Sequence, residues 1–243
     1  MKARSNTRRQ GGFTLVEIAI VLMIVGLLIG GILRGQELIQ SARVRNIIDQ
    51  KSSIQTAYIG FLDRYRMLPG DLTVAQAGIV GNNANSSATG GDGTIAIGTE
   101  STLFFQNLTA AGFISCSACA NATGVAAAIG NSPINVYGNF LSVGNELSSS
   151  AAAGTTWFDG GAAALDRLVV YTGGSIPSQV LAEVDRKADD SVPGTGQLRY
   201  SPVRGATVAT CTSNIVAGVG GAPATIANWA TPSQADCAGA WLF

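Results

Sequence analysis

The hydrophobic and polar positions in the first quarter of the chain repeat with the period of a helix. Phe13–Leu33 is apolar on every face, and Glu17 is its only charged residue. About 20 apolar residues are enough for a helix to cross a bilayer, so this segment is long enough to span a membrane. Beyond it, apolar residues recur every three or four positions and polar residues fill the other faces, which indicates an amphipathic helix.

The amphipathic pattern continues without a proline as far as Leu68-Pro69-Gly70-Asp71, which is a strong stop signal. The sequence therefore predicts one helix from Thr14 to Met67, about 80 Å long. Its second half should pack against a globular domain. The apolar stripe of that half comprises Leu38, Ile39, Ala42, Ile47, Ile48, Ile54, Ala57, Tyr58, Phe61, Leu62 and Tyr65.

The remainder of the chain is predicted to form a mixed head. Its first part, from Asp71 to about Gly98, is rich in Gly, Asn, Ala and Thr and indicates a surface loop. Ser101-Thr102 would cap a short helix that ends at Gly112, and Ser175-Ile176-Pro177 would open another. Strands are predicted at Ile134–Val143, Arg167–Thr172 and Gln197–Ser201. We expect an α+β fold in which the long helix packs against a small antiparallel β-sheet.

Charge is unevenly placed along the chain, although the formal net charge is zero. The segment before Phe13 is basic and contains no acid, so the remainder carries a small acidic excess. Basic flanks of a membrane helix stay in the cytoplasm, which places the carboxy-terminal bulk outside, in the periplasm where a cell has one. The acidic excess gives no electrostatic footprint for nucleic acid. The basic residues of the leader are Lys2, Arg4, Arg8 and Arg9.

Glu17 distinguishes three interpretations of the apolar segment: a cleaved secretory signal, a plain signal anchor, and a membrane helix with a functional acid. A cleaved secretory signal would end at a small-residue cleavage site, but no polar stretch with such a site follows Leu33. A plain signal anchor explains everything except the acid. A carboxylate at the centre of a bilayer costs about 2.5–3.5 kcal/mol, and less nearer the interface, so such a residue is a candidate for function.

The stretch Gly12-Phe13-Thr14-Leu15-Val16-Glu17, behind a short basic leader, resembles the class III signal of type IV pilins and type II secretion pseudopilins. The resemblance implies that prepilin peptidase cleaves between Gly12 and Phe13 and that the new terminus, Phe13, is N-methylated. It also implies that Glu17 pairs with the terminal amine of a neighbouring subunit during assembly. A buried carboxylate is tolerable when a cation meets it.

The resemblance further implies a pilin-like fold in four parts. These are a cytoplasmic leader (1–12), a transmembrane or filament-core helix (13–33), its amphipathic continuation (34–67) and a periplasmic or extracellular domain (68–243). The expected partners are other pilin subunits, prepilin peptidase and the inner-membrane assembly machinery. The precursor would be a single-pass inner-membrane protein, and the assembled form a filament.

Two alternatives to a type IV pilus subunit remain open. A pseudopilin of a type II secretion system carries the same signal, and neighbouring genes rather than the sequence would separate the two. A membrane-anchored periplasmic binding protein or enzyme whose anchor only mimics the signal is the alternative of another class. The larger-than-usual head favours a minor subunit over a major one.

Four cysteines, Cys116, Cys119, Cys211 and Cys237, fit an oxidising compartment. We prefer the local pairs Cys116–Cys119 and Cys211–Cys237. A zinc site is the competing interpretation, but it needs the second pair to lie close together in the sequence. We interpret Cys116–Cys119 as a structural disulfide, because a redox Cys-x-x-Cys pair would lie at the start of a helix that follows a strand. A carboxy-terminal disulfide loop resembles the variable exposed loop of type IV pilins.

The sequence contains no set of residues that indicates catalysis. Histidine is absent, which rules out a Ser-His-Asp triad, and no phosphate-binding or dinucleotide motif is present. We therefore predict no catalytic residues and no cofactor.

Four acids are nevertheless candidates for a metal or for hydrolysis. Asp185, Asp189 and Asp190 could bind calcium, as acidic loops do in some major pseudopilins. Asp92 could do the same in the loop predicted from Asp71 to about Gly98. A hydrogen-bonded turn is the simpler interpretation in both places. Paired carboxylates are also the catalytic groups of glycoside hydrolysis, but no aromatic side chains that would bind a sugar can be placed around them. A local cluster of Lys187, Arg199 and Arg204 would be the only candidate for nucleic acid.

Overall fold

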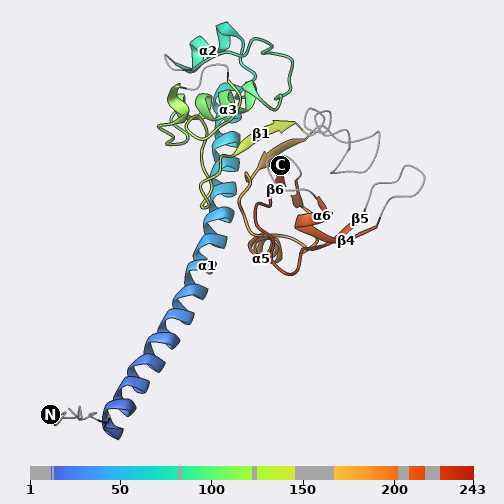
Figure 1. Cartoon of the computed structure of the whole chain (residues 1–243). Helices are drawn as coiled ribbons and strands as arrows, with labels where there is room; N and C mark the ends of the chain where they lie inside the picture. Colours follow the sequence, from blue (N-terminus) through green and yellow to red (C-terminus); the bar gives the residue numbers. More distant parts are fainter. Residues whose placement is uncertain are drawn as a thin grey trace, which may run out of the picture. The chain divides into compact units, whose positions relative to one another are not determined.

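The computed structural model describes residues 12, 14–81, 84–121, 125–145, 167–201, 208–216 and 225–243. The chain forms two compact units, Met1–Ala42 and Arg43–Phe243. The leader and Phe13 lie outside the described residues. Most of the helices and strands are labelled in Figure 1.

The helix α1 runs from Leu15 to Tyr65 and contributes to both units. Thr14 begins it, because its hydroxyl oxygen accepts a hydrogen bond from the Glu17 N–H at 3.2 Å. Arg66, in the left-handed region at φ 56°, ends it just before Pro69. The bounds agree with the predicted helix to within two residues at the carboxy-terminal end and one at the amino-terminal end.

The second unit is a mixed helix and strand domain. Its helices after α1 are α2 (Val74–Val80), α3 (Thr99–Ala110), the short 3₁₀ helix η1 (Cys119–Asn121), α5 (Ser178–Ala188) and α6 (Val208–Cys211). Its strands are β1 (Ser142–Asn145), β2 (Leu168–Tyr171), β3 (Leu198–Tyr200), β4 (Thr212–Val216), β5 (Thr225–Trp229) and β6 (Gly239–Leu242).

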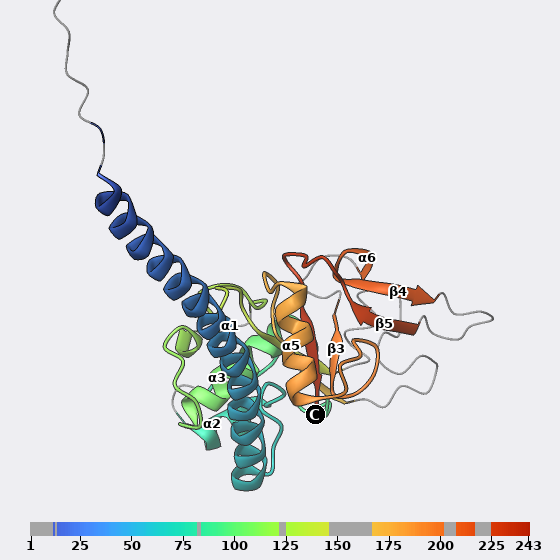
Figure 2. The same cartoon turned by 90° about the horizontal axis from the view of Figure 1, so that it is seen from below.

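Four strands form one antiparallel sheet in the order β1-β2-β6-β3. The last strand of the chain, β6, lies between β2 and β3, with Trp241 opposite both Val170 and Leu198. The strands β4 and β5 form a separate hairpin, on the side of the domain where α5 and β3 lie (Figure 2). This arrangement confirms the predicted α+β fold with a small antiparallel sheet.

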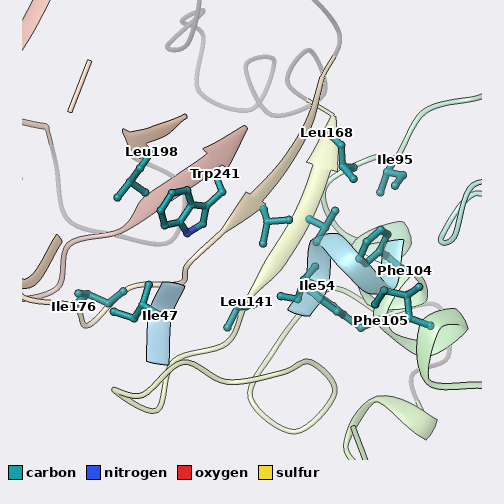
Figure 3. Close-up of a cluster of buried hydrophobic side chains, with 14 of the residues drawn as sticks. Ile47, Ile54, Ile95, Phe104, Phe105, Leu141, Leu168, Ile176, Leu198 and Trp241 are labelled. Carbon is teal, nitrogen blue, oxygen red and sulfur yellow. The ribbon is translucent and has the colours of Figure 1, made fainter. Parts of the chain in front are cut away.

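The core of the second unit forms where the later part of α1 meets the sheet and α3. Buried residues of α1 recur at spacings of three, four and seven and end at Phe61. Ile47 and Ile54 belong to the same cluster as Ile176 and Phe105 (Figure 3). The buried positions on α1 are Val44, Ile47, Ile54, Ala57 and Phe61.

Two positions of the predicted amphipathic stripe are exposed within the first unit. Leu38 and Ile39, assigned to it from the sequence, are 63% and 56% exposed. Both residues lie in the first unit, Met1–Ala42, whereas the buried positions of α1 begin at Val44 in the second unit.

The predicted strand Ile134–Val143 is wrong for most of its length. Only its end belongs to β1, which begins at Ser142. Between Ile134 and Phe140 the chain makes a tight turn, in which Asn135 N–H donates to the Asn139 carbonyl at 2.7 Å and Gly138 has φ 81°. The Asn and Gly residues of this stretch favour a turn over an extended strand.

The first short helix of the head, α3, begins earlier than predicted and has a different cap. Its N-cap is Gly98, and Ser101 and Thr102 are buried inside it. The Ser101 hydroxyl accepts a hydrogen bond from Val143 N–H at 2.7 Å, so this residue joins the helix to β1 instead of capping it. Gly112, at φ 78°, ends the helix as predicted.

The loop predicted from Asp71 to Gly98 contains a helix, α2, which the sequence interpretation missed. Thr73 and Gln76 form a capping box at its start, and this Thr-x-x-Gln spacing was a usable signal. The short helix α5 and the strands β2 and β3 lie where they were predicted.

Candidate functional site

The amino-terminal end of α1 positions Glu17 in the first helical turn. Thr14 caps that turn through its hydroxyl, and the exposed Glu17 carboxylate lies near the positive end of the helix dipole, which is favourable for an anion. Sequence reasoning missed this cap, although the Thr-x-x-Glu spacing of a capping box was present. Gly12 is exposed, and among the described residues no contact of the Glu17 side chain bears on the assembly role that the resemblance implies.

The segment that follows is a helix long and apolar enough to span a membrane. Its large side chains are uncovered in the isolated chain, with exposed fractions from 43% at Val25 to 87% at Leu15. So large an apolar surface is stable only in lipid or against other apolar surfaces. With its short basic leader, the segment fits a membrane-anchored precursor.

The two disulfides connect the preferred pairs, Cys116 with Cys119 and Cys211 with Cys237. This confirms the predicted local pairing, and the sulfur atoms bonded in this way are not arranged as zinc ligands. Cys119 is buried, whereas Cys116 is partly exposed. The Cys116–Cys119 disulfide follows α3 and a loop instead of a strand, so its surroundings agree with a structural role.

The segment that the second disulfide closes contacts a buried carboxylate. Asp185 of α5 is fully buried. It accepts hydrogen bonds from the Trp229 indole N–H at 2.7 Å and from Ser191 N–H at 3.2 Å. Trp229 lies in β5, within the segment that Cys211–Cys237 closes, so this contact fixes the closed segment on α5.

Burial raises the pKa of Asp185 from its usual value to about 6. The hydrogen bonds from Trp229 and Ser191 act in the opposite direction, and the neighbouring carboxylates Asp190 and Asp189 raise the pKa further. The group therefore titrates close to neutral pH, and its ionised form is disfavoured by the surrounding protein.

The three candidate calcium ligands do lie together, with one carboxylate oxygen of each within 4.8 Å of the others. Their oxygens accept hydrogen bonds from the chain itself. Asp190 accepts from Val192 N–H at 2.9 Å and from the Thr195 hydroxyl, and Asp189 accepts from Leu198 N–H at 2.8 Å. Through these hydrogen bonds the acidic residues stabilise the turn that leads into β3. Calcium binding stays a prediction.

The candidate Asp92 lies in a loop that another carboxylate organises. Asp71, which is almost fully buried, accepts hydrogen bonds from Gly91 N–H at 2.6 Å and Gly93 N–H at 2.8 Å. Asp92 accepts instead from the backbone and hydroxyl of Thr94, at 2.8 and 2.9 Å. The loop is thus explained by hydrogen bonds within the protein.

The two basic residues considered for nucleic acid that the structure describes have partners inside the chain. Lys187 lies 3.1 Å from the Glu183 carboxylate, and the Arg199 Nε–H donates to the Gly196 carbonyl at 2.9 Å. Arg204 lies outside the described residues.

Comparison with known proteins identifies the amino-terminal segment. A family model of the prokaryotic N-terminal methylation motif matches residues 7–33. No curated protein and no solved structure matches the chain. The matched segment contains Gly12, Phe13 and Glu17 and continues to the end of the apolar run. The match supports the class III signal of type IV pilins and type II secretion pseudopilins that the resemblance implied, and with it a pilin-like or pseudopilin subunit.

Proposed function

We propose that the chain is a structural subunit of a type IV pilus or a pilus-like filament. The observation that carries this proposal is the methylation motif at residues 7–33, which leads directly into the uncovered apolar half of α1. A signal that is processed at the membrane is thereby joined to a helix that needs apolar neighbours. The disulfide-bonded head is what that helix would display outside the membrane.

Processing occurs at the junction of the leader and the apolar helix. Prepilin peptidase hydrolyses the peptide bond between Gly12 and Phe13, which removes the basic leader on the cytoplasmic side. The amine that is released on Phe13 is then methylated and stays cationic. The mature chain begins with this cation, four positions before the Glu17 carboxylate.

Glu17 is proposed to set the position of each subunit as it joins the filament. Its carboxylate is expensive in an apolar environment unless a cation compensates it. The terminal amine of a neighbouring subunit supplies that cation, and either partner would be left unpaired without the other. Such a contact joins different surfaces of two copies, and contacts of this kind build open helical assemblies.

The proposed route starts in the inner membrane, where the precursor is held by α1 as a single-pass protein. The inner-membrane assembly machinery then moves processed subunits into a filament in the periplasm or outside the cell. A secretion pseudopilin would follow the same route but form short polymers, and the methylation motif is common to both. The genes beside this one and the length of the filaments would separate them.

Substitution of Glu17 tests the assembly role directly. In cells that make the filament, Glu17→Ala should leave cleavage and methylation intact and abolish incorporation into sheared filaments. Glu37→Ala is the matched control, because Glu37 lies on the same helix in an exposed pair with Arg34, a type of pair that contributes little. The control should incorporate normally. Normal incorporation of Glu17→Ala would show that the proposed register contact is wrong.

A further inference from the structure

The second unit contains a hollow of about 570 Å³ beside α1. One wall is the helix itself, at Gln50, Ser53 and Ile54, and the other consists of segments 114–118 and 129–134. We call this hollow the α1 groove. The Gln50 side chain donates a hydrogen bond to the Ile134 carbonyl at 2.9 Å, which holds the second segment against the helix.

The α1 groove is uncharged and has an apolar rim. None of its lining residues is ionisable apart from Cys116, which is in a disulfide. Ile129 and Ile134 line it and are 69% and 53% exposed. Exposed aliphatic residues gathered around a hollow mark an interaction site rather than an ordinary solvated surface.

The far wall of the groove is held in place by covalent and hydrogen bonds. The Cys116–Cys119 disulfide closes the first segment, and Cys119 N–H donates to the Cys116 carbonyl at 3.1 Å. In the second segment, the Asn131 side chain accepts from Ala128 N–H at 2.7 Å and donates to the Ala126 carbonyl at 3.0 Å. A preorganised groove loses less freedom when a partner enters it.

We propose that the α1 groove receives side chains from the apolar half of α1, Leu15–Leu33, of a second copy of this chain. The inference rests on the proposed filament function and names the surface at which one subunit meets the next. The volume is suited to a few aliphatic side chains from one face of a helix, which is the helix-in-groove mode of recognition.

Two observations favour this occupant. The first is that both surfaces lack charge: beyond Glu17 the Leu15–Leu33 segment carries no ionisable residue, so no charge is buried when the helix enters the groove. The second is continuity, because α1 forms one wall of the groove and also carries the uncovered residues that assembly must bury. Groove and apolar segment are different surfaces of one chain, so their contact propagates from copy to copy.

Photo-cross-linking in assembled filaments tests the identity of the occupant. A photoreactive amino acid placed at Ile134 of the full chain should yield, after irradiation and proteolysis, a cross-linked peptide from Leu15–Leu33 of a second copy. The same probe at Ile59, which is exposed to a similar degree at 56% on α1 but does not line the groove, should not yield that peptide. A cross-link from Ile134 to another segment, to a different subunit or to no protein overturns the proposal.

A pair of substitutions measures how much the groove contributes. Ile129→Ser should reduce incorporation into filaments by about tenfold or more, because burial of one large aliphatic side chain is worth at least that factor. Ile79→Ser is the matched control, since Ile79 is 68% exposed and lies on α2 away from the groove. Equal incorporation of the two variants overturns the proposal.

Different results would contradict the α1 groove contact and the filament function. If filaments assemble from the processed chain but the Ile134 cross-link reports another neighbour, only the α1 groove assignment is wrong. If the processed chain forms no filament with any variant, including the wild type, the proposed function itself is wrong and the groove assignment falls with it.

Discussion

Asp185 illustrates how a single residue links the chemistry of this chain to its stability. Its carboxylate is buried beneath the carboxy-terminal region and holds the Trp229 indole at 2.7 Å. Sequence reasoning selected this residue for its charge and for the acids that follow it. It could not foresee the contact with Trp229, because the two residues are 44 positions apart and only the folded chain brings them together.

The raised pKa of Asp185 predicts a pH dependence of stability. The folded pKa, about 6, lies above the usual value of 3.8, so the folded state holds the proton more tightly than the unfolded state. The free energy of unfolding should therefore fall as the pH rises from about 4 to about 7, by up to about 3 kcal/mol. Chemical denaturation of the full chain in detergent across this range measures it.

The control for this prediction is Asp185→Asn, which keeps an oxygen acceptor for Trp229 but cannot ionise. Other carboxylates contribute their own slopes, so the informative quantity is the difference between the two proteins. The wild-type chain should lose more stability than the variant as the pH rises. Parallel profiles would show that Asp185 does not titrate in this range.

A side chain added at Gly60 should lower the stability of the fold. A Cβ atom built on Gly60 would lie 2.8 Å from the Phe113 ring, which packs against α1 at this point. Gly60→Ala should lower the free energy of unfolding by about 1–2 kcal/mol, because the half-buried ring that packs against the core must shift. Gly78→Ala is the control, since nothing lies within 4 Å of that Cβ position in α2, and alanine favours a helix. Thermal unfolding that ranks Gly78→Ala below Gly60→Ala would contradict this packing.

Among the elements, α1 was the most predictable and β6 the least. Neighbouring residues determine the helical period of α1, and Leu68-Pro69-Gly70-Asp71 marks its end, so both signals are local in the sequence. The strand β6 is Gly-Ala-Trp-Leu, which contains no β-branched residue. It is a strand because β2 and β3 pair with it from both sides, and such long-range pairing overrides local propensity.

The two disulfides should contribute unequally to stability. Cys211–Cys237 spans 26 positions and Cys116–Cys119 only 3. In the chain-entropy model, closing the longer segment stabilises the fold by about 3–4 kcal/mol and closing the shorter one by about 2 kcal/mol. The double variant Cys211→Ser/Cys237→Ser should therefore unfold at a lower denaturant concentration than Cys116→Ser/Cys119→Ser. The reverse order would mean that the Cys116–Cys119 bridge contributes more than the restriction of the unfolded chain.

At the scale of the whole molecule, the sequence was informative about the class of function because the signal is compact. The residues from Gly12 to Glu17 are contiguous, and the apolar run that follows is visible without any fold. The α1 groove could not be predicted, because its walls come from α1 and from two segments 60 or more positions farther along the chain. Its exposed isoleucines have no periodicity that would distinguish them from residues of a core.

The central claim is that this chain is a processed filament subunit, and the intact mass of the protein extracted from membranes tests it most directly. The measurement is made in cells that have an active prepilin peptidase. The account predicts a chain that lacks Met1–Gly12, begins at Phe13 and carries one additional methyl group. A chain that retains Met1–Gly12 in those cells would contradict the claim.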